Sequence, residues 1–167
     1  MVQTYFRAFG LGVVAGMRSL VAPALLSHKL ARTMPAKEPQ KPIHYLTLPP
    51  VSLGLKAIAG IEILGDKIPN VPDRTFAPEF GARIASGATC GGFLSQAEGA
   101  DIPVGAVVGG LGTVVGTLAF FRLRQWLTHE LGVPDPVVAL AEDALAIGVG
   151  WSIVNAMQPA PQLNRAQ

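Results

Sequence analysis

Two long runs without a charged side chain constrain the fold of this chain most. Residues 102–121 and 144–163 contain no Asp, Glu, Lys or Arg. A transmembrane helix needs about 20 mostly apolar residues to cross roughly 30 Å of hydrocarbon. The first run ends abruptly at Arg122 and Arg124, and the polar end of the second begins near Asn155. Both runs are therefore predicted to cross a membrane as helices.

The composition of the whole chain supports this interpretation. Of the 167 residues, 50% are hydrophobic and 14% are charged, whereas soluble domains average about 25% charged residues. The net charge is only +2, and no basic stripe with interleaved aromatic residues indicates nucleic acid as a partner. A single cysteine, Cys90, excludes an intrachain disulfide, and no spaced Cys/His set indicates a metal site. We therefore expect a membrane protein without a cofactor or a metal, and without identifiable catalytic residues.

Three further segments complete the expected bundle. Residues 8–27 are apolar apart from Arg18, and residues 81–94 carry only Arg83. Residues 51–65 are apolar apart from Lys56 and Glu62, but the segment is short. We predict an all-α, polytopic transmembrane bundle of four full spans plus one short or re-entrant helix, forming a single domain over residues 1–157. The expected helices cover about 8–28, 51–66, 81–97, 103–122 and 136–156, with an extended proline-rich loop at 33–50 and a disordered tail at 158–167.

The short segment 51–65 has two interpretations, a tilted span or a re-entrant half-helix. Lys and Arg are enriched in cytoplasmic loops. If the segment does not cross, the acidic turn of Glu98 and Asp101 falls on one side, and a set of eight basic residues falls on the other. This distribution favours a re-entrant segment and an outside N-terminus. The basic set is Lys29, Arg32, Lys37, Lys41, Lys67, Arg74, Arg122 and Arg124.

Glycines form a stripe along the expected helix 103–122. Gly105, Gly109, Gly112 and Gly116 recur at i, i+4, i+7 and i+11, which places them on one helix face. Membrane helices associate through close packing at small residues, so another backbone is expected against this face. The partner is a neighbouring helix of the same chain or of a second copy. Alternatively, the glycines line a pore or act as hinges.

Ionisable residues inside the apolar segments form the candidate ion- or substrate-binding site. A charge near the bilayer centre is costly and is by default a functional hypothesis. One interpretation is that the two arginines pair with the acids and lock the bundle. The other is that a carboxylate left in excess carries protons or coordinates a cation, since burial raises its pKa. The set consists of Arg18, Glu62, Asp66, Arg83, Glu142 and Asp143.

The two halves of the chain share a weak pattern. The segment 16–18 reads Gly-Met-Arg and the segment 81–83 reads Gly-Ala-Arg, and each precedes a helix with two acids. Inverted repeats with short or broken helices are typical of transporters.

Several of these motifs resemble those of an uncharacterised bacterial membrane family, the domain of unknown function 4126. The resemblance covers roughly residues 8 to 155. It implies a small multi-helix protein of the inner membrane and no known activity. The motifs are Gly16-Met17-Arg18-Ser19 with Pro23, Glu62 with Asp66-Lys67-Ile68-Pro69, the glycine-rich span, and Glu142-Asp143-Ala144-Leu145-Ala146-Ile147.

Three functions are open at this point. The leading hypothesis is a small multi-pass transporter or channel in which Glu62 and Asp66 bind a cation or proton. In this hypothesis Arg18 is their counter-ion or an anchor for an anionic substrate. The second is a non-catalytic structural or assembly subunit that forms homo-oligomers through the glycine stripe. The third and weakest is an intramembrane enzyme acting on a lipid phosphate, with Arg18 on the phosphate and the two acids on a divalent metal. The lipid bilayer is an expected partner in each case.

Overall fold

The computed structural model describes residues 1–34, 42–65 and 77–160 of the chain. Within these ranges every regular element is helical, which confirms the all-α prediction. The elements are α1 (Val2–Met17), α2 (Val21–Thr33), α3 (Pro42–Thr47), α4 (Pro49–Gly65), α5 (Ala77–Ala97), α6 (Ile102–Gln125), the π-helix η1 (Trp126–Glu130) and α7 (Asp135–Asn155).

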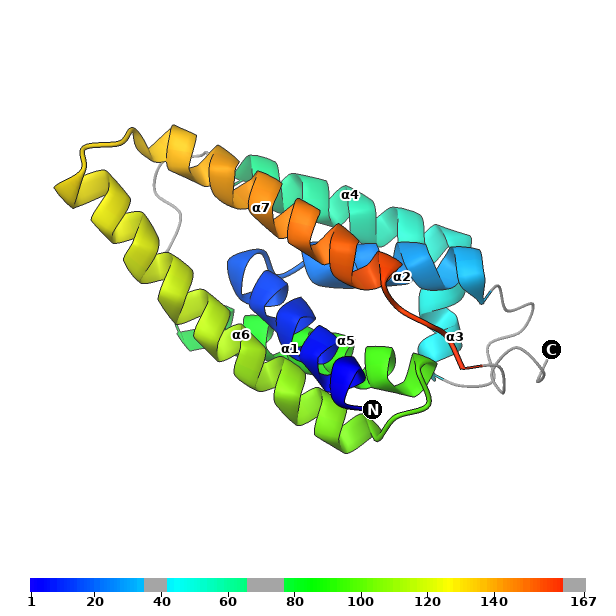
Figure 1. The fold of residues 1–167 in the computed structure, drawn as a ribbon. Coiled ribbons are helices and arrows are strands. Elements are labelled where there is room, and N and C mark those ends of the chain that lie inside the picture. Colours follow the sequence, from blue (N-terminus) through cyan, green and yellow to red (C-terminus); the bar gives the residue numbers. More distant parts are fainter. Residues whose placement is uncertain (35–41, 66–76, 161–167) are drawn as a thin grey trace.

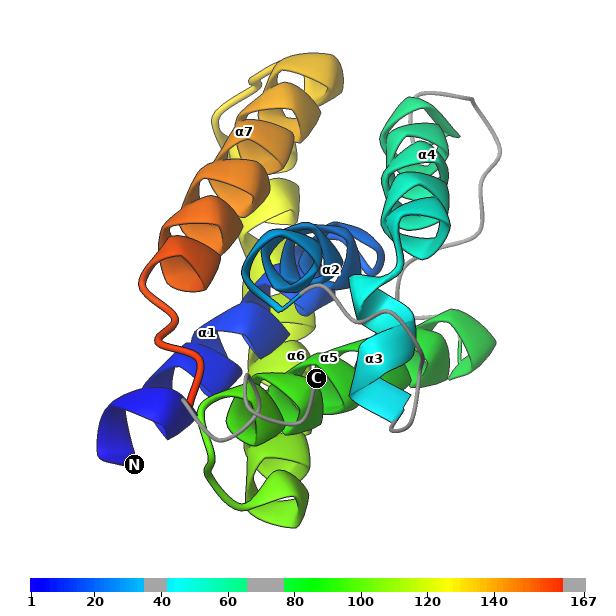
Figure 2. The same cartoon turned by 90° about the vertical axis from the view of Figure 1, so that its right-hand side faces the viewer.

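Helices α6 and α7 diverge from the turn that follows η1 and run along two edges of the molecule, with α1 between them (Figure 1). Asp101 caps α6 by accepting a hydrogen bond from the backbone N–H of Val104, and Gly132, with a φ of 64°, lies in the turn that leads to α7. Helices α1 and α5 pack against α6. Viewed from the end, α2 lies at the centre, between α7 and α4 (Figure 2).

Two helical stretches of the described residues are long and apolar enough to cross a membrane. They are Ile102–Glu130, with a mean hydropathy of 1.9, and Asp135–Asn155, with a mean hydropathy of 1.7. The first contains the whole charge-free run 102–121, and the second contains residues 144–155 of the run 144–163, which the helix does not follow to its end. The expectation of four full spans is not confirmed, since no other described helix meets the same criterion.

The outer surface and the interior both depart from those of an ordinary soluble fold, although the core itself is largely apolar. Large apolar side chains lie on the outside, such as Leu53 of α4, 69% exposed, and Val107 of α6, 63% exposed. By contrast, the guanidinium-bearing side chain of Arg18 is only 1% exposed, and Arg83 is buried as well. Large exposed apolar surfaces mark contact with another apolar phase or with a partner.

The expected single helix over residues 8–28 is wrong, because the structure divides it into α1 and α2. Arg18 has an extended backbone, with a φ of −139° and a ψ of 111°, and the next helix begins only at Val21. Pro23 supplies the local reason. It lacks the N–H that would bond to the carbonyl of Ser19 four residues earlier, and its ring clashes with a helical carbonyl there. We call residues 18–20 the helix break.

The two halves of this broken helix run in opposite directions along α7. From Gly10 through Val14 to Arg18, α1 contacts Ile153, then Gly150, then Asp143, so it is antiparallel to α7. Helix α2 runs parallel to α7. Its Leu25 contacts Gly150, its His28 stacks on Trp151, and its last turn lies against the end of α7. Hence α1 and α2 form a helical hairpin instead of one continuous helix.

The tip of the hairpin lies near the middle of α7. At 1.5 Å per residue, Asp143 is about 12 Å from the start of this helix and about 18 Å from its end. Backbone N–H and C=O groups that are buried away from water need hydrogen-bond partners, because leaving them unpaired costs free energy. The break therefore needs partners for its exposed backbone groups.

The expected loop over residues 33–50 also needs correction. Its described part contains the end of α2, the short helix α3 and the start of α4. Proline is compatible with a helix start because its missing N–H has no partner in the first turn, which explains helices that begin at Pro42 and Pro49. The expected disordered tail over residues 158–167 needs a correction at its start as well. The N–H of Ala160 donates a hydrogen bond to the carbonyl oxygen of Ala97, at the end of α5. Residues 35–41 and 161–167 lie outside the described ranges.

The glycine stripe of α6 faces α1 and α5 of the same chain. A Cβ added at Gly105 or Gly109 would meet the backbone of α5, and one added at Gly112 or Gly116 would meet the backbone of α1. These backbones approach so closely only because the side chains are absent. The stripe is thus covered within one copy, while the expected homo-oligomer stays a prediction.

Candidate functional site

The helix break is surrounded by side chains from α4, α5, α6 and α7. A helix end leaves up to four backbone groups without partners, with partial negative charge at the C-terminus and partial positive charge at the N-terminus. Here the C-terminus of α1 and the N-terminus of α2 meet in the interior. Both ends are satisfied by side chains of the matching chemistry.

Arg83 of α5 caps the C-terminus of α1. Its Nη1 donates to the carbonyl oxygens of Gly16 and Met17, each at 3.2 Å. The carbonyl of Gly16 also accepts from Oγ1 of Thr117, on α6, at 3.2 Å. A cation at this position complements the negative end of the helix dipole. Nη2 of Arg83 binds Glu79 one turn earlier at 2.7 Å.

Glu62 of α4 caps the N-terminus of α2. Its Oε1 accepts from both the N–H and the hydroxyl of Ser19 at 2.8 Å, and its Oε2 accepts from the N–H of Leu20 at 2.9 Å. A carboxylate that accepts backbone N–H groups at a helix N-terminus gains from both hydrogen bonding and the dipole. Glu62 therefore holds the start of α2 in place.

Arg18, the first residue of the break, pairs with Asp143 of α7. Its Nε lies 2.6 Å from Oδ1 of Asp143, and both side chains are buried. The other carboxylate oxygen of Asp143, Oδ2, has no hydrogen-bond partner among the described residues, and neither does Nε of Arg83. Buried polar groups without a partner are rare and call for an explanation. At Asp143 the break has an oxygen that is able to take a proton or a cation.

The break has further polar contacts that the sequence analysis missed. The hydroxyl of Ser86 donates to the carbonyl of Ser19, the same carbonyl that Pro23 cannot satisfy. Thr117 was also missed, although Gly109, Thr113 and Thr117 follow at four-residue intervals on one face of α6. A hydroxyl at the spacing of the glycine stripe is the signal that could have revealed it.

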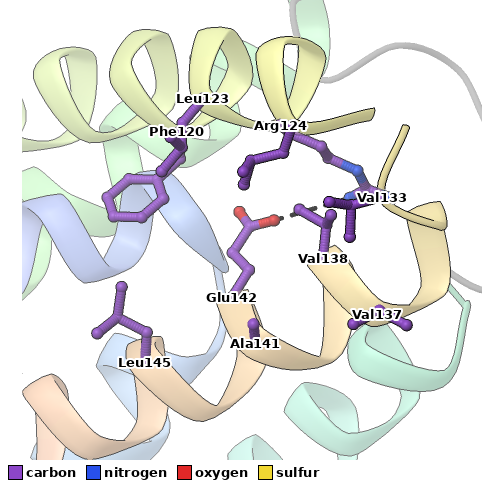
Figure 3. A pocket seen from close by; sticks show the side chains of 10 residues that line it. Phe120, Leu123, Arg124, Val133, Val137, Val138, Ala141, Glu142 and Leu145 are labelled. Atoms are coloured by element: carbon purple, nitrogen blue, oxygen red, sulfur yellow. Dashed lines mark ion pairs between the residues drawn. The ribbon is translucent and has the colours of Figure 1, made fainter. Parts of the chain in front are cut away.

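Glu142, predicted as part of the same cluster, belongs to a different site. It points from α7 toward Arg124 of α6, whose Nη1 lies 3.7 Å from its Oε2 (Figure 3). Arg124 also binds the carboxylate of Asp135 through two hydrogen bonds of 2.8 and 2.7 Å. Arg124 and Glu142 line a cavity of about 210 Å³ that is otherwise apolar, with Phe120 and Leu145 among its walls. Adjacent positions 142 and 143 thus face different neighbours.

Of the six predicted residues, the structure brings four to the break, namely Arg18, Glu62, Arg83 and Asp143. Asp66 lies outside the described residues. In the part of the chain that the structure covers, no group of three or more His, Cys, Asp and Glu side chains is placed to hold a metal ion. The hypothesis of a metal held by Glu62 and Asp66 therefore stays untested.

The comparison with known families agrees with the resemblance seen in the sequence. Among curated proteins and among solved structures, none is similar enough to the chain to match. The family model described as a domain of unknown function, DUF4126, matches residues 6–158, nearly the whole chain. The chain therefore belongs to the DUF4126 family.

Proposed function

We propose that the chain is a multi-pass integral membrane protein of the inner membrane, and that its helix break carries a proton or a small cation. One observation supports this most. A discontinuous helix turns back near the middle of α7. Charged side chains of α4 and α5 bind its open ends, and Asp143 of α7 binds the side chain of Arg18 at the break. Broken helices with charged partners at the midplane are typical of secondary transporters.

The carboxylates of Asp143 and Glu62 would act by weakening their contacts with the helix break when they take up a proton. Protonation of Asp143 weakens its attraction to Arg18, because the negative charge is lost. Protonation of Glu62 weakens its hold on the N–H groups of Ser19 and Leu20. Each event loosens one attachment of the hairpin tip, so proton binding is coupled to movement of the break.

A flux assay tests this proposal. The purified protein is reconstituted into liposomes that contain a pH-sensitive dye, and proton entry is followed after a potential is imposed. We expect flux above that of empty liposomes, and at least a tenfold loss in Asp143→Asn and Glu62→Gln. Glu98→Gln is the matched control, since Glu98 pairs with Arg7 at the opposite end of α5. Equal flux in all four proteins would refute the assignment of the carboxylates.

A structural role is the second candidate. It is favoured by the direct contact of Arg18 with Asp143 at 2.6 Å, which closes the tip of the hairpin against α7. In this case the parent protein gives no flux above empty liposomes for protons or alkali cations, and the substitutions at the break affect only stability. The flux of the parent protein therefore separates the two candidates.

A further inference from the structure

A second cavity lies between the C-terminal ends of α2 and α7, away from the helix break. Its volume is about 250 Å³, close to the lower end of the range for small-ligand pockets. We call it the basic pocket. It is lined by His28, Lys29, Arg32, Thr33, Trp151, Val154 and Asn155.

The charge of the basic pocket has one sign. Its lining includes Lys29 and Arg32 but no Asp or Glu, and neither of the two forms an ion pair with a described residue. A cation near a helix C-terminus is favoured by the helix dipole, which accounts for Arg32 alone. It does not account for a second cation and a polar cavity beside it.

His28 is oriented by two neighbours. Nζ of Lys56 lies 2.9 Å from its Nδ1, and because an ammonium group only donates, Nδ1 must be the acceptor. The neutral ring then carries its hydrogen on Nε2 and offers a donor there. The ring also stacks on Trp151, with the ring centroids 5.7 Å apart. The basic pocket thus combines one oriented histidine with two cationic side chains.

The position of the pocket indicates what approaches it. Asn155 is the last residue of the candidate span Asp135–Asn155, so the pocket lies where that span ends. Phospholipid headgroups occupy this level of a bilayer, tryptophan is enriched there, and basic pockets between helices bind anionic headgroups.

We propose that the basic pocket binds a phosphate group, with Lys29 and Arg32 as its charged ligands. Arginine and lysine are the common phosphate ligands, and charge-assisted hydrogen bonds to phosphate are strong. The phosphate is that of an acidic phospholipid or of a small soluble anion. Only the lipid source rests on the membrane embedding proposed above; the binding itself is independent of transport.

The chain offers a built-in reporter for the test. It has two tryptophans, so Trp126→Phe leaves Trp151 as the only one. The full-length protein in a neutral detergent is titrated with sodium phosphate, and separately with dihexanoyl phosphatidylglycerol, against sodium chloride at equal ionic strength. We expect a saturable change in Trp151 fluorescence with a phosphate source and none with chloride.

Two arginines provide a matched pair of variants. Arg32 and Arg122 are both exposed, and each lies in the last turn of its helix, but only Arg32 lines the pocket. Arg32→Gln should weaken binding about tenfold, as expected for one lost charge-assisted hydrogen bond, and Arg122→Gln should leave it unchanged.

Each outcome has one meaning. Saturation by the lipid alone supports the proposal with a headgroup as the ligand, and saturation by inorganic phosphate supports it with a soluble anion. No saturable response to either probe, or equal weakening in the two arginine variants, overturns it. A protein that moves no protons but binds phosphate keeps this proposal and loses only the transport function.

Discussion

The side chains of Arg18 and Asp143 are in direct contact at 2.6 Å, although 125 positions separate them in the sequence. The pair attaches the tip of the α1–α2 hairpin to the middle of α7. Moving two charges out of water costs several kcal/mol per ion. The pair is therefore expected to stabilise the fold only while both partners are present.

Removal of one partner should destabilise the protein more than removal of both. Asp143→Asn leaves the Arg18 cation buried without this counter-charge, at an expected cost of about 3–5 kcal/mol. The double change Arg18→Met with Asp143→Leu removes both charges and should recover most of that stability. The free energies of unfolding of the single and the double variant are measured on the purified proteins in mixed detergent micelles. A double variant less stable than Asp143→Asn would contradict this account.

Loss of the Glu62 carboxylate should loosen the start of α2. Glu62→Ala removes the acceptor of three hydrogen bonds from Ser19 and Leu20, and hydrogen bonds to charged groups contribute about 1.5–3 kcal/mol each. We expect amide exchange at residues 19–21 to accelerate at least tenfold, as read by hydrogen–deuterium exchange. Glu98→Ala, remote from the break, should leave exchange there unchanged. Unaltered protection in the Glu62 variant would show that other contacts hold the break.

Alanine in the glycine stripe should destabilise the fold. A Cβ at Gly109 would collide with the carbonyl oxygen of Gly87, and one at Gly112 with that of Phe9. Overpacking typically costs about 1–3 kcal/mol. Gly148→Ala is the control, because a Cβ at that helical position meets no atom within 4 Å, and it should raise stability by about 0.5–1 kcal/mol. Thermal unfolding followed by circular dichroism measures the stabilities of these variants. Equal shifts of the melting temperature in the stripe variants and in Gly148→Ala would contradict this prediction.

At the α6–α7 hairpin, Arg124→Gln should have a larger effect than Asp135→Asn. Asp135 is 57% exposed, and exposed ion pairs contribute about 0–1 kcal/mol. Glu142, only 4% exposed, loses a nearby cation when Arg124 is replaced, and removal of one partner from a buried ion pair is destabilising. The stabilities of the two variants test this directly. An equal loss in both would mean that Glu142 does not depend on Arg124.

The sequence was informative about helices wherever apolar residues persisted without interruption. The charge-free runs marked α6 and α7, and the polar residues inside apolar segments marked Arg18, Glu62, Arg83 and Asp143, which the structure gathers at the break. Both inferences use a local property of the chain, the cost of placing charge among apolar residues.

The break itself was not predicted, because its main partners are remote in sequence. Residues 8–27 are apolar with one interruption, and Pro23 alone is compatible with a kinked helix. What decides the outcome is that Glu62 and Arg83 satisfy the two helix ends. Likewise, nothing in the sequence separates Glu142 from Asp143, since the difference depends on which helix lies beside each.

The opposite directions of α1 and α2 along α7 predict that both ends of this hairpin face the same side of the membrane. In a Cys90→Ala background, Val2→Cys and Thr33→Cys should react with a membrane-impermeant maleimide from one side of oriented vesicles. Asn155→Cys, at the adjacent end of α7, is the positive control for that side. Leu131→Cys, in the α6–α7 turn, should react only from the other side. A single crossing by residues 8–28 would instead place positions 2 and 33 on opposite sides, and labelling of that kind would refute the re-entrant hairpin.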